Sequence, residues 1–544
     1  MKFDELLKIE LTVTLAGAAH EIPAEDVRRL ELELRQSGFE GAVEFVARDD
    51  TSQGGRYEDA LKEVFFDTGE LSVELSVVPV RVAGEAPSTF EPLVVRGRAT
   101  HRTVHEEATD WSAEQPLLWR RYRIEFQDPA RAAWRQHFPC DLLTDKSLLE
   151  VVEAQAPPDV SVASSWSVAT TTRRQWFLHL PGSAGVSFYD FLCWYAEARG
   201  GALAYDYTDQ SYRVVDVLAG IEPARALFGD DVGAVALSVP EPGRARPRLR
   251  NSYANAAETV TAERTGASAP LACDELLRTP VAEEQAARAE EQRLRHEQLR
   301  PRAHLRFRRY PSAQLVPGAL VSCPAGARFA KNSRLVASSW IVRSLRLEAR
   351  SEAGATGGRL GPGAVPLQVE LSAVLADVEE RFATDLEYVA PRYPGFVEGV
   401  VVSRQGEETD KTWDVTQCET TAIDEVEVNV PLFDASVFAP AEPGTVGANV
   451  YLPHCRGARV LLALDLDTAS IVRTLSWREG AALPKEGQGE RLVFGKSEES
   501  FTKLTHVYDD DAPVFGVVRV NDKDRVALTL SEGKLVIGVA EDTG

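Results

Sequence analysis

Ser187-Phe-Tyr-Asp-Phe-Leu-Cys-Trp-Tyr-Ala-Glu-Ala-Arg199 is followed by Gly200-Gly201 and then by Ala202-Leu-Ala-Tyr-Asp-Tyr207. The first part has the apolar spacing of a helix, and the glycine pair stands where a helix C-cap favours a positive φ. The residues after the glycines alternate between apolar and polar, as half-buried strands do. The segment therefore predicts a helix over 187–199 that ends at the glycines and leads into a strand over 202–207.

Two further elements precede this helix. Tyr122-Arg-Ile-Glu-Phe126 has the alternation of a strand and stops at Asp128-Pro129. Asp145-Lys-Ser-Leu-Leu-Glu-Val-Val-Glu153 has helical spacing, with Asp145 as its expected N-cap. Together these elements predict an α/β segment over residues 116–215.

β-rich sequence lies on both sides of the α/β segment. Leu71-Ser-Val-Glu-Leu-Ser-Val-Val78 is typical of residues 1–115, where the period of two indicates half-buried strands. Residues 216–390 are a second β-rich unit with one long helix expected over 281–299. That helix is nearly all Ala, Glu, Gln, Arg and Leu, and it is interpreted either as a solvated helix on a β-domain or as a partner-binding helix.

Pro391-Arg-Tyr-Pro-Gly395 is interpreted as a rigid linker that marks a domain boundary. An all-β module is expected over 391–484. The tail, residues 485–544, contains three short alternating segments. These are Val514-Phe-Gly-Val-Val518, Arg525-Val-Ala-Leu-Thr-Leu530 and Lys534-Leu-Val-Ile-Gly-Val539. They are too few to bury a core alone, so the tail must pair with something else.

Composition excludes several classes of protein. The chain has 544 residues, 44% of them hydrophobic and 26% charged, which is typical of folded proteins of several domains. Its formal charge of -23 repels phosphate backbones, so nucleic acid is not an expected partner. The start lacks the apolar core of a signal peptide, and no run is long enough for a membrane helix. Assembly in the cytoplasm, without stable membrane insertion, is therefore expected.

The sequence contains no recognisable catalytic motif. The patterns GxSxG, HExxH and GxGxxG are absent, and the six scattered cysteines predict buried thiols rather than disulfides or a zinc site. Gly489 to Ser497 imitates a phosphate loop but has five residues between its glycines where that loop has four. His101 and His105 have the i, i+4 spacing of helical metal ligands, but they follow a predicted strand and are expected to face solvent. No catalytic residue, cofactor or metal is expected, and the chain is predicted not to be an enzyme.

The order of segments resembles the VgrG-type spike of type VI secretion systems and the hub and spike proteins of contractile phage tails. The resemblance covers roughly residues 120–480 and departs from the family where Ile423-Asp-Glu-Val-Glu-Val-Asn-Val430 replaces its Asp-x-x-Gly-Arg-Val signature. The segments that carry it are Tyr122–Pro129 with Asp145–Val152, Arg174–Leu180 with Phe188–Tyr207, Leu315-Val-Pro-Gly318, Ser338-Ser-Trp-Ile-Val-Arg-Ser-Leu345 and Pro394-Gly-Phe-Val-Glu-Gly-Val-Val401.

The resemblance implies a mainly β fold: two hub β-barrels (1–115 and 216–390), the intervening α/β segment, an OB-fold domain (391–484) and a short trimeric β-prism or β-helix spike (485–544). It also implies a structural homotrimer that joins the inner tube of a contractile injection machine to a membrane-piercing tip. The implied partners are a hexameric tube protein seated on loops of the two barrels, baseplate proteins and effector cargo. The particle would be delivered outward.

The tail supplies the candidate assembly residues. One apolar face on each of two strands is expected to lock the trimer, and it consists of Val526, Leu528, Leu530, Leu535, Ile537 and Val539. The chain then ends at Glu541, Asp542, Thr543 and Gly544, where a separate tip protein resembling the PAAR-repeat family, with its own metal, is expected to bind. Two alternatives remain open: a glycan or cell-wall hydrolase, and a carbohydrate- or receptor-binding β-protein.

Overall fold

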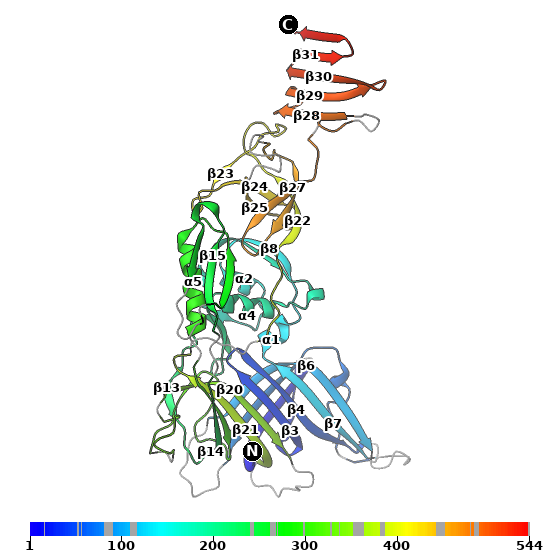
Figure 1. Cartoon of the computed structure of the whole chain (residues 1–544). Helices are drawn as coiled ribbons and strands as arrows, with labels where there is room; N and C mark the ends of the chain where they lie inside the picture. Colours follow the sequence, from blue (N-terminus) through cyan, green and yellow to red (C-terminus); the bar gives the residue numbers. More distant parts are fainter. Residues whose placement is uncertain are drawn as a thin grey trace. The chain divides into compact units, whose positions relative to one another are not determined.

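The computed structural model describes residues 1–544 except 16, 52–53, 56, 81–90, 109–116, 240–243, 262–267, 269, 298–299, 327–328, 337, 352–363, 381–386, 442–451, 479, 484–488 and 542–544. The fold is mainly β (Figure 1). The chain forms two compact units. The first contains Met1–Phe138, Leu148–Thr171 and Leu180–Ala390, and the second contains Pro139–Ser147, Thr172–His179 and Pro391–Gly544.

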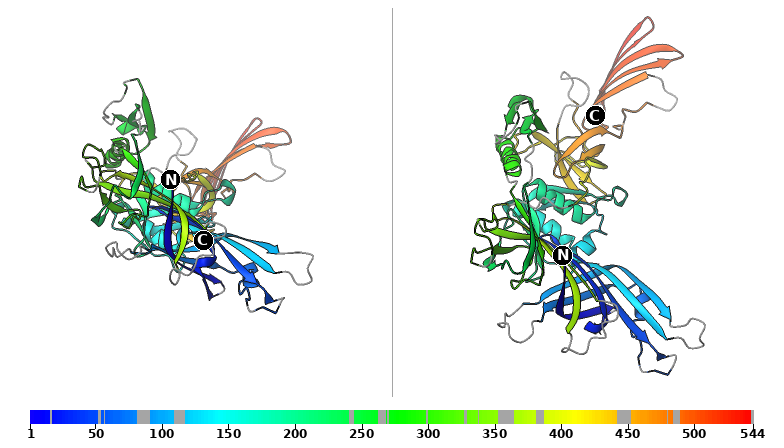
Figure 2. Two further views of the ribbon diagram at one scale, coloured as in Figure 1. Left: turned by 90° about the horizontal axis from the view of Figure 1, so that it is seen from below. Right: turned by 60° about the horizontal axis from the view of Figure 1, so that its bottom comes forward.

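The first unit contains a closed ring of strands. Their order is β20-β3-β4-β7-β6-β5-β1-β21, and pairing of β20 with β21 closes the ring into a barrel (Figure 2). The alternation noted in the sequence puts Leu, Val and Phe side chains inside it. The barrel strands are β1 (Lys2–Leu15), β3 (Val27–Arg35), β4 (Gly38–Asp49), β5 (Leu71–Pro79), β6 (Leu93–Ala108), β7 (Leu118–Gln127), β20 (Trp340–Arg350) and β21 (Ala364–Asp377), with β2 (Ala18–Ile22) paired to β1.

A second curved sheet shares β20 and β21 with the barrel. Its order is β13-β19-β20-β21-β18-β14. The added strands are β13 (Ile221–Ala226), β14 (Val232–Ser238), β18 (Arg302–Phe307) and β19 (Ala319–Ser322). Strand pairing therefore divides this region differently from the expected boundaries at 115 and 216: β7 lies beyond 115 yet pairs with β4 and β6, and two strands near 340–377 belong to both sheets.

The α/β segment of the first unit is built around α4 (Phe188–Ala198). Ser187 and Asp190 form a capping box at its start, and Gly200 follows its end with φ +80°, as the sequence predicts. β11 (Ala202–Asp206) follows, also as predicted. The other elements are α1 (Pro129–Trp134), α2 (Leu148–Ala154), α3 (Ser167–Thr170), β9 (Val162–Ala163) and β12 (Ser211–Val215).

The long helix predicted over 281–299 is α5 (Ala282–Glu297), which packs against β15. Its Gln285 is buried and its side-chain oxygen accepts a hydrogen bond from Asn251 at 3.3 Å. The small sheet beside it contains β15 (Arg246–Asn251), β16 (Glu258–Thr261) and β17 (Ala272–Leu277). The helix thus lies on a β-sheet, which agrees with the first of its two interpretations.

The second unit has a six-stranded sheet over a compact apolar core. The order is β23-β24-β22-β26-β27, with β25 paired to β24 and also in contact with β27. Its strands are β22 (Gly395–Val401), β23 (Thr416–Gln417), β24 (Asp424–Val430), β25 (Ala435–Pro440), β26 (Arg459–Leu464) and β27 (Ala469–Thr474).

A hairpin from the middle of the chain completes this core. β8 (Cys140–Lys146) pairs with β10 (Arg173–His179), and Leu142 and Phe177 are buried among the valines and leucines of the six-stranded sheet. The Phe177 N–H donates to the Leu466 carbonyl at 2.8 Å, and the Tyr393 hydroxyl donates to the Phe177 carbonyl at the same distance. The hairpin is therefore part of the second unit, although the sequence had assigned it to the α/β segment.

Asp145 was expected to cap a helix, and this was wrong. It lies in β8 with φ +52°, and α2 begins three residues later. These residues form a strand and not a helix because Leu142 is buried in the core of the second unit and β8 pairs with β10 along its length.

The tail forms a five-stranded antiparallel meander. The sequence predicted three of its strands, and two more precede them because residues 489–509 also alternate. The strands are β28 (Gly489–Gly495), β29 (Ser500–Asp509), β30 (Ala512–Asn521), β31 (Asp524–Ser531) and β32 (Lys534–Ala540).

Because the hairpin belongs to the second unit, Phe177→Ala should destabilise that unit selectively. Truncating a buried Phe costs about 3–5 kcal/mol. We expect faster hydrogen exchange in peptides of β22–β27 and little change in those of the barrel, measured on the intact protein.

Phe191→Ala is the matched control, because this ring is equally buried but lies in α4 of the first unit. It should speed exchange in the first unit instead. The same exchange pattern for both variants would contradict the assignment of the hairpin.

Candidate assembly surface

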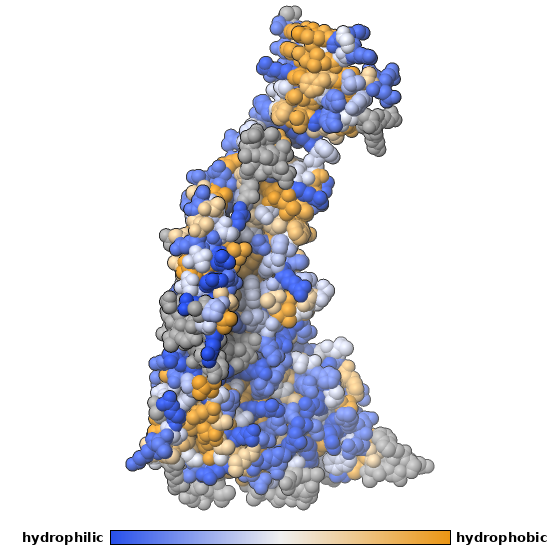
Figure 3. Space-filling view, viewed as in Figure 1, coloured by the Kyte–Doolittle hydropathy of each residue, from blue (hydrophilic) through white to orange (hydrophobic). Residues whose placement is uncertain are grey.

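One face of the tail sheet has a central row that is apolar on all five strands, and the rows beside it also contain Thr502, His506 and Arg519. The cross-strand register aligns Leu492, Leu504, Val517, Leu528 and Ile537 in a single row. Side chains on one strand that are two residues apart share a face, so each neighbouring row lies on the same side of the sheet. Figure 3 shows apolar side chains gathered over these strands.

The structure brings together all six residues predicted from the tail. They form three directly opposed pairs between β31 and β32: Val526 with Val539, Leu528 with Ile537 and Leu530 with Leu535. In the single chain this surface remains largely in solvent, since Ile537 is 66% exposed and Leu535 is 60% exposed. Leu528 is half-buried.

Sequence reasoning missed the part of this face that lies on the first three strands. The residues are Leu492, Phe494, Leu504, Phe515 and Val517. The signal was present, because Leu492 and Phe494, like Phe515 and Val517, stand two apart. We call the whole set, with the six residues of β31 and β32, the tail face.

The opposite side of the sheet is mixed in character. Val493, Lys503, Val518, Ala527 and Gly538 form its central row. The contrast gives the sheet a distinct apolar side, which a second surface must cover to keep it from water.

The expected tip residues are only partly described. Glu541 follows β32 directly and is exposed, and Asp542, Thr543 and Gly544 lie outside the described residues. β32 pairs with β31 on one side, so the backbone groups of its other edge have no strand partner among the described residues.

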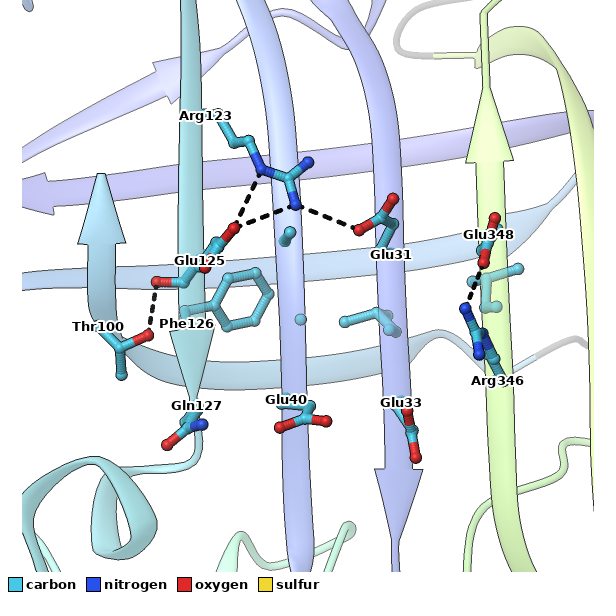
Figure 4. A pocket seen from close by; sticks show the side chains of 14 residues that line it. Glu31, Glu33, Glu40, Thr100, Arg123, Glu125, Phe126, Gln127, Arg346 and Glu348 are labelled. Atoms are coloured by element: carbon cyan, nitrogen blue, oxygen red, sulfur yellow. Dashed lines mark hydrogen bonds and ion pairs between the residues drawn. The ribbon is translucent and has the colours of Figure 1, made fainter. Parts of the chain in front are cut away.

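A polar pocket of about 240 Å³ lies on the first unit (Figure 4). Its glutamates come from four neighbouring strands, so it is the natural place to look for the carboxylate pair of a hydrolase. They are Glu31 and Glu33 of β3, Glu40 of β4, Glu125 of β7 and Glu348 of β20.

Arginines pair with every glutamate that lines this pocket. Arg123 donates to Glu125 at 3.2 Å and to Glu31 at 3.3 Å, and Arg346 pairs with Glu348 at 2.7 Å. Glu33 pairs with Arg35 and Glu40 with Arg131. Burial lowers the pKa of Arg123, but its hydrogen bonds to the two glutamates raise that pKa more, to above its ordinary value. The arrangement is a half-exposed salt-bridge network along the strands.

The other chemical candidates from the sequence lie apart. His101 and His105 are exposed on β6, as predicted, and the imitation phosphate loop is strand β28. Among the described residues, no three His, Cys, Asp or Glu side chains gather as metal ligands, and no helix is long and apolar enough to cross a membrane.

The architecture defines a mainly β protein with a VgrG-like fold. A chain of the Francisella PdpA–VgrG complex in its half-lidded form matches with a TM-score of 0.71 at 11% identity, covering 98% of this chain and 88% of that one. The lidless PdpA–VgrG complex gives 0.67 at 12% identity, covering 99% of both chains. The lidded Francisella complex gives 0.67 at 13%, covering 99% of this chain and 80% of that one.

These identities establish a shared fold and nothing beyond it. No protein-family model matches the sequence, and no curated protein does.

Substitution of two arginines of β7 should distinguish a buried ion-pair network from a half-exposed one. Arg120 is 11% exposed and pairs with Asp49 at 3.1 Å and with the buried Asp59 at 3.2 Å. Arg120→Met should therefore cost about 3–5 kcal/mol, because it leaves the buried Asp59 without its cation. Arg123→Met, in the polar pocket, should cost less than about 1 kcal/mol.

Urea denaturation measures the free energy of unfolding of each variant, with hydrogen exchange in barrel peptides as the probe. Equal losses for the two variants would contradict the description of the pocket as a weak, solvated network.

Proposed function

We propose that the chain is the structural spike hub of a contractile injection machine, assembled as a homotrimer, that joins the inner tube to the tip. The tail face carries this proposal. It is an apolar surface spanning five strands that one chain leaves in water, at the end of a chain with a VgrG-like fold.

Three copies of the tail can cover the apolar side that one copy leaves exposed to water. A sheet with one apolar side is stable when another apolar surface covers it, and three such sheets around a threefold axis cover one another. Burying a Val, Leu or Ile side chain contributes about 1.5–3 kcal/mol. Fixing the backbone costs about 1–2 kcal/mol per residue. The tail is therefore only marginally stable in a single chain and becomes stable when its apolar side is removed from water.

The remaining parts receive roles consistent with this assembly. The six-stranded sheet of the second unit is proposed to be the OB-fold domain. The barrel and the curved sheet that share β20 and β21 are proposed to give six near-equivalent positions per trimer for a hexameric tube ring. Baseplate proteins and effector cargo are proposed as further partners, and the particle is proposed to be delivered outward.

The end of the tail is the proposed seat of the tip protein. In a trimer the open edge of β32 would be present three times, and unpaired backbone groups at such an edge bind another protein readily. A PAAR-like protein with its own metal is the proposed occupant, held near Glu541, Asp542, Thr543 and Gly544.

Leu528→Asp should abolish or weaken the trimer. It would place three carboxylates in the dried interior without partners, at a desolvation cost of several kcal/mol each. Truncation after Gly489 should do the same by removing the tail. Light scattering is expected to give about three times 59.6 kDa for the intact chain and a smaller mass for both variants.

Ala527→Asp is the matched control, because residue 527 is adjacent on β31 but lies on the mixed side of the sheet. It should leave the trimer intact. If both the truncated chain and Leu528→Asp stay trimeric and as stable as the intact protein, the tail does not hold the assembly together.

A density map of an assembled particle tests the two ends of the hub. We expect the loops of the first unit to contact the tube ring directly and a separate small protein to cover β32. Another protein between tube and hub would contradict the first expectation, and a bare tip beyond Gly544 would contradict the second.

A further inference from the structure

A groove of about 950 Å³ lies within the second unit, between β28 and loops of the six-stranded sheet. Its floor is strongly apolar, and two tryptophans on it are largely in solvent: Trp477 is 80% exposed and Trp413 is 50% exposed. Leu492 and Phe494, which belong to the tail face, also line it. The groove is therefore continuous with the surface that the proposed trimer buries.

The groove is basic in a protein that is acidic as a whole. Its described lining includes six cations and no carboxylate: Lys411, Arg456, Arg459, Arg478, Arg491 and Lys496. Three of them bind backbone carbonyls and have no carboxylate partner in the described part of the chain. Arg478 donates to Val493 and Gly495, Arg491 to Ala482 at 3.1 Å, and Arg456 to Ser403 and Gln405. Their charge is left for an anionic occupant.

The tail itself offers such an anion. Asp509, Asp510 and Asp511 form the turn between β29 and β30, and all three are exposed. Asp510 and Asp511 have φ values of +46° and +63°, which produce the tight turn that presents the three carboxylates together. No cation pairs with them among the residues that the structure describes, so the three carboxylates are accessible to a partner.

The meander places this turn at the opposite strand ends from three of the cations. Successive turns of an antiparallel meander alternate between the two ends of its strands. The turns at 496–499 and 522–523 lie at one end, and the turn at 510–511 lies at the other. Lys411, Arg478 and Lys496 gather at the first end, because the Lys411 N–H donates to the Lys496 carbonyl and Arg478 donates to the Gly495 carbonyl. A chain therefore keeps its own Asp509–Asp511 away from these three cations.

Threefold symmetry can bring the two strand ends together. Every contact in a cyclic trimer joins two different patches, so the strand ends that carry the 510–511 turn of one sheet can meet the strand ends that carry the 496–499 turn of the next. Pairing between the edge strands β28 and β32 is disfavoured, because Arg478 already caps the Val493 and Gly495 carbonyls of β28. The strand ends are therefore left to meet, while the tail faces cover one another around the threefold axis.

We propose that the Asp509–Asp511 turn of one protomer docks in the basic, tryptophan-lined groove of the next protomer. This inference rests on the proposed homotrimer and adds the contact that sets its register. The occupant is a second copy of the chain, chosen by charge complementarity and by the continuity of the groove with the tail face.

Charge reversal tests the contact. Asp510→Lys and Lys411→Glu should each raise the trimer dissociation constant by about tenfold or more, because each trimer loses three ion pairs at once. The double variant Asp510→Lys/Lys411→Glu should restore most of the affinity. Asp522→Lys, in the turn at the other end of the strands, is the matched control and should have little effect. Sedimentation velocity on a dilution series measures all four variants, and no rescue in the double variant would overturn the proposal.

Cross-linking gives a test that does not depend on measurable dissociation. Cys455 is a native, half-buried thiol in the lining of the groove. Under mild oxidation, Asp510→Cys should bond to Cys455 of the next protomer and give a covalent trimer on a non-reducing gel. Asp522→Cys should not, and Asp510→Cys/Cys455→Ser should lose the product.

The outcomes also separate this inference from the proposed function. A chain that is trimeric by light scattering but gives no Asp510→Cys cross-link would overturn the docking contact and leave the trimer standing. A chain that is monomeric throughout would overturn both.

Discussion

The molecule depends on one apolar row that crosses the tail from Leu492 to Ile537. Five strands align their large side chains on one side, and no described element of the chain covers them. A second surface is needed to remove these side chains from water, which is why we propose an assembly. The first unit, by contrast, buries its own core within a single chain.

Two long strands hold the sheets of the first unit together. β20 and β21 pair with each other and belong both to the closed barrel and to the curved sheet beside it. A movement of one sheet therefore strains the other through the same hydrogen bonds. The two sheets are therefore mechanically coupled through β20 and β21.

Local patterns predicted the local structure well. The helix at 188–198, its glycine end and the following strand were evident from spacing and caps, and the apolar face of β31 and β32 from simple alternation. Pairing between distant segments was not evident, because a period of two identifies a strand but not its neighbour. The β8–β10 hairpin thus appeared to belong to the α/β segment, and Asp145 appeared to be a helix cap. The basic groove was also beyond sequence reasoning, since its cations come from separate segments between Lys411 and Lys496.

The shared strands also constrain how the protein is made. β1, at the start of the chain, pairs with β21, where Lys2 faces Glu370, so the barrel cannot close until residues near 377 have left the ribosome. At about 5–20 residues per second this takes on the order of 20–75 s. Throughout that interval the early strands expose open edges and apolar sides, the surfaces from which aggregation starts. Production of this hub should therefore depend more on chaperone supply and translation rate than its finished stability would suggest.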